Sequence, residues 1–259
     1  MTQLEHEEIR GIVRDRYGDL ARHASAGGDD CCGPSCCASE ADAETAMDLY
    51  AAGETEGLPV EALAASAGCG NPIALASLRQ GETVIDFGSG GGIDCFLAAR
   101  AVGEQGRVIG IDMTQDMIDL ARSNAGKLGL SNTEFHLAEM EHTPVVDDTA
   151  DILISNCVIN LAPDKDAVFR EAFRVLKPGG RLMVSDMVLV EALPEEQAAD
   201  TANWVACLAG AELKEVYLAR IADAGFADVE VVSETQLENG DGWRSSVRSM
   251  NIRATKPGS

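Results

Sequence analysis

The sequence is short of basic residues and has no long hydrophobic run, and both shortages narrow its possible partners. Lysine and arginine together number 20 against 43 aspartate and glutamate residues, which gives a formal net charge of −23 at pH 7. This excess of negative charge repels the phosphates of nucleic acids and of anionic lipids, so we expect neither as a partner. Because no uninterrupted apolar run approaches about 18 residues, the sequence predicts no transmembrane helix.

The marks of a secreted protein are also absent. Residues 1–10 are acidic and lack the apolar core of a signal peptide. The chain has 259 residues, of which 46% are hydrophobic, enough to build one sizeable α/β domain. We therefore expect a cytoplasmic monomer whose eight cysteines serve thiol chemistry or metal binding rather than a disulfide framework.

Residues suited to general acid–base catalysis are few. The four histidines, which we interpret as surface residues, lie in no recognisable catalytic setting: His6, His23, His136 and His142. An enzyme that transfers a group to an oxygen or nitrogen atom normally needs a general base nearby to remove that atom's proton. The histidines offer no recognisable candidate for such a base, so the sequence favours a receiving atom that carries no proton.

The most informative pattern is a strand, a glycine-rich turn and a helix. Residues 83–87 are mostly apolar and β-branched, and the apolar segment 93–102 has the composition of a helix. Between them stand glycines at alternate positions, Gly88, Gly90 and Gly92. Glycine permits the tight turn and lets a ligand approach the backbone. The spacing departs from the dinucleotide-binding fingerprint, because position 93 holds isoleucine where that fingerprint has its third glycine.

A second predicted strand, residues 106–111, ends at Asp112. A carboxylate at the end of the second strand of such a unit is placed to accept hydrogen bonds from a ribose diol. The glycine turn and Asp112 together predict a site for an adenosine-type cofactor.

This pattern, over residues 71–190, resembles the class I S-adenosylmethionine (SAM) methyltransferases. The resemblance implies a Rossmann-like α/β fold with a seven-stranded, mostly parallel sheet in the order 3-2-1-4-5-7-6 and helices on both faces. It also implies SAM as cofactor, with Met140 and the Glu139 or Glu141 carboxylate around its base. The residues expected to bind SAM are Asp86, Gly88, Ser89, Gly90, Asp112, Met113, Met140, Glu141 and Asn156.

The rest of the chain divides into a helical, cysteine-rich segment over residues 1–70, expected to cap the active site, and the methyltransferase domain over residues 71–259. Beyond the elements above, the patterns predict strands at 133–137, 150–155, 181–190, 229–233 and 249–254. They predict helices at 1–26, 44–52, 60–65, 73–78, 114–128, 164–176 and 195–224, with Thr114 as an N-cap and a stop signal at 177–180. On the first helix, Tyr17 is a candidate to touch the cofactor.

Several cysteines stand at loop positions where packing does not explain them. Cys69 precedes the first strand, Cys157 ends the fourth, and Cys207 lies in the later helical region. Three convergent thiolates suit a soft, thiophilic ion. A further cluster in a Gly- and Pro-containing loop could bind a soft ion or form reversible disulfides: Cys31, Cys32, Cys36 and Cys37. The eighth, Cys95, is expected to be a buried packing residue.

The cysteine motifs resemble those of the arsenite methyltransferases. The matching stretches are Cys69-Gly70-Asn71-Pro72, Asp94-Cys95, the run 155–161 with 163–165, and Cys207 followed by Gly210-Ala211. By this resemblance Cys69, Cys157 and Cys207 bind As(III) and are the catalytic residues. The family has one further cysteine where this chain has two adjacent pairs, so the resemblance does not say which of those four takes part.

The resemblance also implies a mechanism. Arsenite exchanges its hydroxides for thiolates, and the arsenic lone pair then attacks the methyl group of SAM. The partners implied are arsenite or methylarsenite as substrate, and thioredoxin or glutathione as the reductant of an enzyme disulfide formed after transfer.

Two other functions fit the same patterns. The chain could methylate a small organic acceptor such as a quinone, a sterol or a thiol, in which case replacing Cys69 or Cys207 would leave activity intact. It could instead be a non-catalytic thiol protein that binds arsenic or another soft metal. The complete glycine turn with Asp112 argues against the second alternative, because a chelator needs neither.

Overall fold

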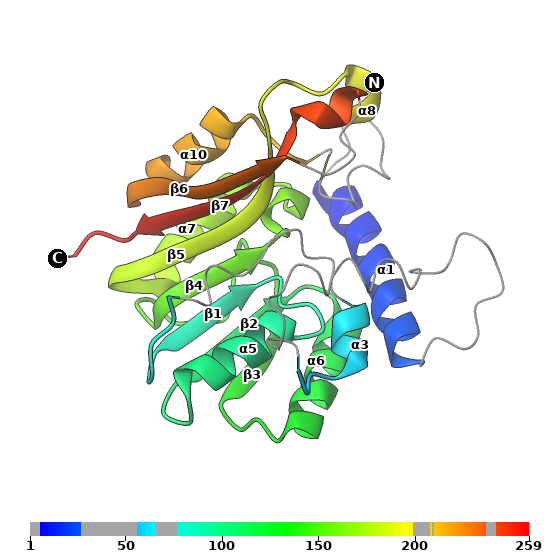
Figure 1. Ribbon diagram of the computed structural model, residues 1–259, viewed down its shortest axis with the longest axis vertical. Helices are drawn as coiled ribbons and strands as arrows, with labels where there is room; N and C mark the ends of the chain where they lie inside the picture. The colour runs from blue at the N-terminus through cyan, green and yellow to red at the C-terminus, as the bar shows by residue number, and fades with distance from the viewer. Residues whose placement is uncertain are drawn as a thin grey trace.

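A single sheet organises the chain in the computed structural model, which describes residues 6–26, 56–65, 77–198, 208, 210–236 and 242–258. The seven strands lie in the order β3-β2-β1-β4-β5-β7-β6 (Figure 1). They are β1 (Thr83–Phe87), β2 (Arg107–Asp112), β3 (Thr133–Leu137), β4 (Ala150–Asn156), β5 (Leu176–Leu189), β6 (Ala227–Gln236) and β7 (Val247–Thr255). The first five strands pair in parallel, whereas β7 is antiparallel to β5 and β6. This arrangement confirms the predicted Rossmann-like, mostly parallel sheet.

Helices cover both faces of the sheet. The helices are α1 (His6–Ser25), α3 (Val60–Ala64), α5 (Ile93–Val102), α6 (Gln115–Leu128), α7 (Lys165–Val175), α8 (Glu195–Ala198) and α10 (Lys214–Asp223), with short 3-10 helices η1 (Ile159–Leu161) and η2 (Gly242–Ser246). Helices α7 and α10 contribute to the core on one face, and α5 and α6 to the core on the other.

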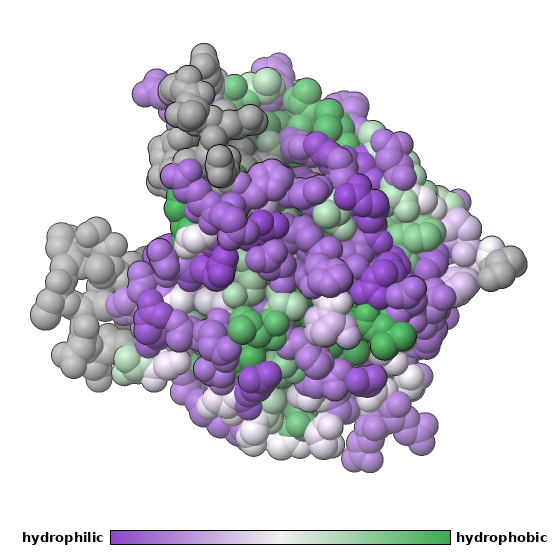
Figure 2. Space-filling view, turned by 180° about the vertical axis from the view of Figure 1, so that it is seen from behind, coloured by the Kyte–Doolittle hydropathy of each residue, from purple (hydrophilic) through white to green (hydrophobic). Residues whose placement is uncertain are grey.

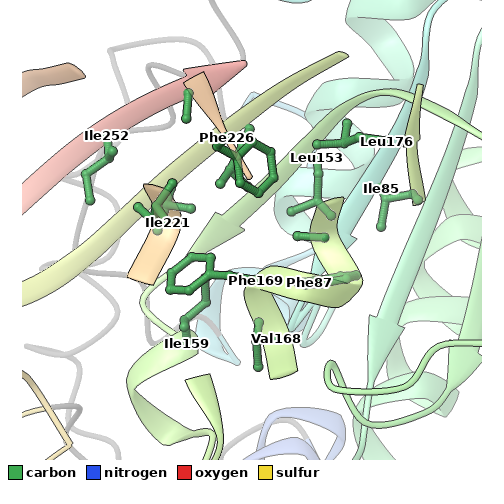
Figure 3. Packing of buried hydrophobic residues seen from close by; sticks show 14 of the residues in the cluster. Ile85, Phe87, Leu153, Ile159, Val168, Phe169, Leu176, Ile221, Phe226 and Ile252 are labelled. Atoms are coloured by element: carbon green, nitrogen blue, oxygen red, sulfur yellow. The ribbon is translucent and has the colours of Figure 1, made fainter. Parts of the chain in front are cut away.

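The strands are buried on both faces because their successive side chains feed different cores. Ile85 packs in the cluster under α7 and α10, and its neighbour Val84 packs in the cluster under α5. Figure 3 shows the first cluster, in which Phe169, Ile221 and other apolar side chains meet over the sheet. These cores fix the strand ends, and therefore the loops that follow them.

Helix α1 packs outside the sheet, against α6 and α3. It lies beyond the carboxyl ends of the parallel strands, where their following loops meet (Figure 1). Its buried side chains, Ile9, Val13 and Ala21, recur at near-helical spacing along one face. The leading helix is therefore in position to cover whatever these loops bind.

Hydrophilic side chains cover much of the face seen in Figure 2, with smaller apolar groups between them. Among the residues that the structure describes, no helix is long and apolar enough to cross a membrane.

Most predicted elements are present with bounds close to those expected. The helix predicted over 195–224 is wrong in its middle: Leu208 and residues 210–213 are not helical, and Leu213 instead bridges to Leu189. Strand β5 begins at Leu176, the last residue of the predicted helix, and includes the predicted stop signal at 177–180, because Gly179 and Gly180 exchange backbone hydrogen bonds with Lys256. The two final strands are longer than predicted, and Thr114 is the N-cap of α6 but makes no side-chain capping bond.

Some expectations fall outside the described residues. The helix predicted at 44–52 does, as do most of the helix predicted at 73–78 and the boundary proposed between residues 70 and 71. The division into a capping segment and a methyltransferase domain stays a prediction.

Candidate active site

A cavity lies at the carboxyl ends of β1 to β4, with α1 along one side. Ligands of open α/β sheets bind at this edge. Helices α1 and α3 and the segments that follow β1, β2, β3 and β4 line this cavity. In that order, the lining residues are Arg10, Val13 and Tyr17; Ala62 and Ala65; Gly88, Ser89, Gly90, Gly91, Ile93 and Asp94; Asp112, Met113, Thr114 and Met117; Ala138, Met140 and Glu141; and Asn156, Cys157, Val158, Leu161, Ala162 and Pro163. The prediction that these loops form one site is consistent with this geometry.

The backbone of the glycine turn faces the open space of the cavity. All three alternate glycines have positive φ, with Gly90 at 50°. A Cβ on Gly90 would meet nothing within 4 Å, so its backbone faces open space. Beside it, the buried Ser89 hydroxyl makes no hydrogen bond to any described residue. An open backbone and an unpartnered buried hydroxyl fit a polar ligand resting on this turn.

Asp112 is held by the backbone on both sides. Its Oδ2 accepts from the Gly90 N–H at 2.9 Å, and its Oδ1 accepts from the Thr114 N–H at 2.9 Å. Burial raises the pKa of Asp112, and the backbone N–H groups of Thr114 and Gly90 oppose that rise. The two hydrogen bonds fix the carboxylate at the cavity wall with lone pairs left for a diol.

The loop after β3 is tied to α1 by ion pairs. Arg10 lies 3.0 Å from Glu141 Oε1 through its terminal nitrogen and 3.2 Å from Glu139 Oε2 through Nε. Met140 and Glu141 line the cavity, whereas Glu139 does not. Helix α1 and the predicted base-binding loop therefore form one wall.

Cys157 stands at the opposite end of the cavity, just after β4. Its side chain is buried among apolar residues that include Val13 of α1 and Leu208. Its φ is +58°, a conformation that non-glycine residues rarely adopt. The Cys157 N–H donates to the Ser185 carbonyl oxygen at 2.7 Å, and the sulfur is disulfide-bonded. Such backbone strain is typical of functional positions.

A buried polar network holds the loop that carries Cys157. The Asn160 side-chain amide donates to Asp186 Oδ1 at 2.8 Å and to the Met187 carbonyl oxygen at 2.7 Å. Asp186 Oδ2 accepts from the Tyr217 hydroxyl at 3.0 Å. Burial raises the pKa of Asp186 to about 6. The network connects η1 after β4 to strand β5 and helix α10.

Asp86 does not line the cavity, although it was predicted to bind cofactor. It is almost fully buried in β1, and its Oδ2 accepts from the Cys95 thiol at 3.3 Å. Burial, followed by the charge of Asp94, raises the pKa of Asp86 well above its usual range. Cys95 is a free, buried thiol, as the sequence predicts.

The remaining predicted cofactor residues lie on the cavity wall: Gly88, Ser89, Gly90, Asp112, Met113, Met140, Glu141 and Asn156. Of the predicted arsenic ligands, only Cys157 is among the described residues. Cys69, Cys207 and the cluster Cys31, Cys32, Cys36 and Cys37 lie outside them. Within the described part of the chain, no group of three His, Cys, Asp or Glu side chains is arranged to hold a metal ion.

Two polar cavity residues, Arg10 and Asp94, were not predicted as site residues from the sequence, whereas Tyr17 was a candidate to touch the cofactor. Arg10 and Tyr17 stand seven positions apart on α1, two helical turns along the face that includes Val13. The sequence signal for this wall was the helical spacing of apolar residues on that face. Such spacing predicts that the face is buried but does not identify the part of the protein that it packs against. Asp94 also lines the cavity, and its Oδ2 accepts from the Asn156 side-chain amide at 3.2 Å.

The strand order, the antiparallel last strand and the site at the strand ends define a Rossmann-like class I methyltransferase fold. The chain belongs to the family described as the methyltransferase domain, whose model matches residues 78–237.

Relatives within this family are arsenite methyltransferases. That of Halobacterium salinarum is 41% identical over 245 residues, which cover 91% of this chain and 62% of the relative. The human arsenite methyltransferase is 39% identical over 153 residues, 56% of this chain and 40% of the relative. The chain thus spans between two fifths and three fifths of the length of these relatives.

Among solved structures, the arsenic(III) S-adenosylmethionine methyltransferase of Chlamydomonas reinhardtii is similar, with a TM-score of 0.65 and 35% identity over 73% of this chain and 67% of that one. A SAM-dependent methyltransferase from Aquifex aeolicus, at 21% identity and a TM-score of 0.54, shares the fold.

Proposed function

We propose that this chain is an arsenite methyltransferase that transfers a methyl group from SAM to As(III) bound by cysteine thiolates. The observation that carries the proposal is Cys157: a strained, buried cysteine at the end of β4, in the same cavity as the glycine turn and Asp112. The similarity to arsenite methyltransferases supports it from an independent direction.

The donor end of the cavity suits SAM. Asp112 would accept hydrogen bonds from the ribose hydroxyls, and the turn from Gly88 to Gly90 would pass beneath the methionine portion. The Ser89 hydroxyl supplies a polar group that has no partner among the described residues. Asp94 places negative charge near the turn, where SAM carries its ammonium and sulfonium groups.

The acceptor end suits a thiophilic ion. Two described residues next to the other predicted ligands support a shared arsenic site. Leu208, which follows Cys207 in sequence, packs in the same cluster as Cys157, and Ala65, four residues before Cys69, lines the cavity. The apolar side chains around Cys157 exclude water, which favours thiolate–arsenic bonds over hydrolysis.

SAM supplies an electrophilic methyl group, and the chain's own part is to orient the acceptor. Cysteine thiols would replace the hydroxides of arsenite, which leave as water, and would keep arsenic trivalent with its lone pair free to attack the methyl carbon. Methyl transfer would release S-adenosylhomocysteine and oxidise arsenic from As(III) to As(V), which two enzyme thiols would reduce again by forming a disulfide. The attacking lone pair carries no proton to remove, which agrees with the lack of a histidine among the described residues that line the cavity. Orientation of two bound reactants can supply up to about 7–11 kcal/mol of a barrier. Because Cys157 is disulfide-bonded in this structure, a dithiol such as thioredoxin, or glutathione, would first reduce it.

The test is methylation of arsenite by the purified chain with SAM and a thiol reductant, with arsenic species separated by chromatography and counted by mass detection. We expect methylated arsenic from the wild type and none from Cys157→Ser. The matched control is Cys95→Ser, which changes a buried thiol outside the arsenic site and should retain product formation.

The alternatives give different results in the same assay. A protein that methylates an organic acceptor would bind SAM but form no methylated arsenic. A chelator would retain arsenite on dialysis without turnover. Full activity in Cys157→Ser would contradict the proposed mechanism.

A further inference from the structure

The cavity residues stand in the same order as the strands that carry them. Across the sheet, Cys157 follows β4, the glycine turn follows β1, Asp112 ends β2 and Glu141 follows β3. An adenosine whose ribose lies at Asp112 and whose sulfur points toward Cys157 must therefore direct its base toward the loop after β3. This orientation rests on the proposed function.

Among the described residues, Arg10 of α1 is the one basic side chain that lines the cavity at that end. Its terminal nitrogen lies 3.0 Å from Glu141 Oε1, and the two side chains are 13% and 11% exposed. Its other carboxylate contacts in the described part of the chain, Glu139 and Glu7, are more exposed, at 39% and 77%. Of these three carboxylates, Glu141 is therefore the one that Arg10 holds at the cavity wall and away from water.

An ion pair at this depth holds the carboxylate of Glu141 in one position at the cavity wall. Arg10 occupies Glu141 Oε1, which leaves the second oxygen, Oε2, as an acceptor with no hydrogen bond to any described residue. A fixed anionic acceptor at the base end attracts an N–H donor and repels a carbonyl oxygen.

We propose that Arg10 is a positioning residue for base recognition: by fixing the Glu141 carboxylate, it makes the site accept the exocyclic amine of adenine and reject a base that carries a carbonyl oxygen at the same position. The choice between the two bases therefore depends on Arg10 of α1 and Glu141 of the loop after β3. Arg10 and its helix lie outside the sheet, whose strand ends carry the proposed ribose site.

The same contact links base binding to the docking of α1. Val13 and Tyr17 follow Arg10 at three and seven positions, and both line the cavity. A ligand that strengthens the Arg10–Glu141 ion pair would therefore also stabilise the packing of α1 against the loop after β3.

The experiment compares binding of S-adenosylhomocysteine and S-inosylhomocysteine by calorimetry, without arsenic, so that binding rather than turnover is measured. The two ligands differ at C6, where the amine of adenine is replaced by a carbonyl oxygen, and at N1, which is an acceptor in adenine and carries a hydrogen in hypoxanthine. We expect the wild type to prefer the adenine ligand by about 10- to 100-fold, the range for a hydrogen bond to a charged group. In Arg10→Gln we expect the preference to fall below about threefold.

Two further variants make the test specific. Arg14→Gln removes a more exposed arginine one turn along the same helix, 3.8 Å from Glu7, and should keep the wild-type preference. Glu141→Gln offers an amide that can donate to a carbonyl oxygen, so its preference for the adenine ligand should narrow as well. This variant tests the pair independently of whether Arg10→Gln folds. Hydrogen exchange adds a second measure: the adenine ligand should slow exchange in α1 of the wild type but not of Arg10→Gln.

The outcomes separate this inference from the proposed function. An unchanged preference in a folded Arg10→Gln, or in Glu141→Gln, would overturn the role of the pair. A wild type that binds neither ligand would overturn SAM dependence, and with it the proposed function. Loss of arsenite methylation alone would leave the base preference intact.

Discussion

Val158 packs directly against Gly88, so closely that a Cβ on Gly88 would lie 2.4 Å from Val158 Cγ2. Gly88 opens the turn after β1, and Val158 follows Cys157 after β4. The glycine turn and the loop that carries Cys157 therefore rest on each other, and position 88 admits no side chain.

The first prediction is that Gly88→Ala destabilises the fold and weakens cofactor binding. The new methyl group would collide with Val158, and alanine would have to adopt a φ near +73°. The left-handed conformation costs about 1–2 kcal/mol and overpacking about 1–3 kcal/mol, so we expect a loss of roughly 2–5 kcal/mol in urea unfolding. Gly126→Ala is the control: it lies on α6, and its Cβ would meet nothing within 4 Å. It should be neutral or slightly stabilising, and equal losses in both variants would show that the contact is not responsible.

The second prediction concerns Asp112. In Asp112→Asn an amide N–H₂ replaces one of two oxygens that now accept from Gly90 and Thr114, so one of these backbone donors loses its partner. We expect the dissociation constant for S-adenosylhomocysteine to rise by about 10- to 100-fold, as for loss of a charged hydrogen-bond acceptor. Asp119→Asn, at an exposed position on α6, should bind as the wild type does. A normal dissociation constant in Asp112→Asn would remove this residue from the site.

The third prediction is that Cys95 resists alkylation in the folded protein. Its sulfur is fully buried, and burial followed by the charge of Asp86 raises the pKa of this thiol well above its usual range. Because the thiolate is the reactive form, labelling by iodoacetamide at pH 8 should be more than about 100-fold slower than that of a free cysteine. Peptide mass spectrometry should find Cys95 labelled only in denaturant. Rapid labelling under native conditions would contradict its burial.

The fourth prediction is a pH dependence that arises from Asp186. Its pKa rises from 3.8 to about 6 on folding, chiefly by burial, so the folded state favours the protonated carboxyl. The protonated Asp186 carboxyl therefore contributes to the free energy of unfolding. This contribution is fully present below about pH 4 and is lost as the pH rises through about 6, a loss of about 3 kcal/mol at 1.36 kcal/mol per pKa unit.

The measurement is the free energy of unfolding of the wild type and of Asp186→Asn at pH 4 and pH 7. Between these pH values the wild type should lose about 2 kcal/mol relative to the variant, which cannot ionise there, because the unfolded carboxyl is already partly ionised at pH 4. Asp223→Asn, which removes one exposed charge from α10, controls for the change in net charge. A difference between wild type and Asp186→Asn that does not vary with pH would contradict the assignment.

Local patterns were enough to predict the glycine turn and Asp112, which line the cavity. Residues 83–112 show it: an apolar strand, alternating glycines and Asp112 at the next strand's end each follow from neighbours in sequence. Long-range pairings could not be predicted. Arg10 meets Glu141 across 131 positions, and Leu176–Gly180 becomes strand because Gly179 and Gly180 pair with Lys256. Asp86 was assigned to the cofactor because it precedes the glycines, but an alternating strand turns it into the core, toward Cys95.

The order of the cavity residues along the chain has a consequence for how new acceptors can arise in this fold. Among the described cavity residues, those of the glycine turn and of the loops after β2 and β3 precede position 142, and those around Cys157 follow position 155. The connecting stretch includes Val146, which is 75% exposed. Recombination in that stretch would exchange the residues around Cys157 while the glycine turn, Asp112 and the loop after β3 pass on together.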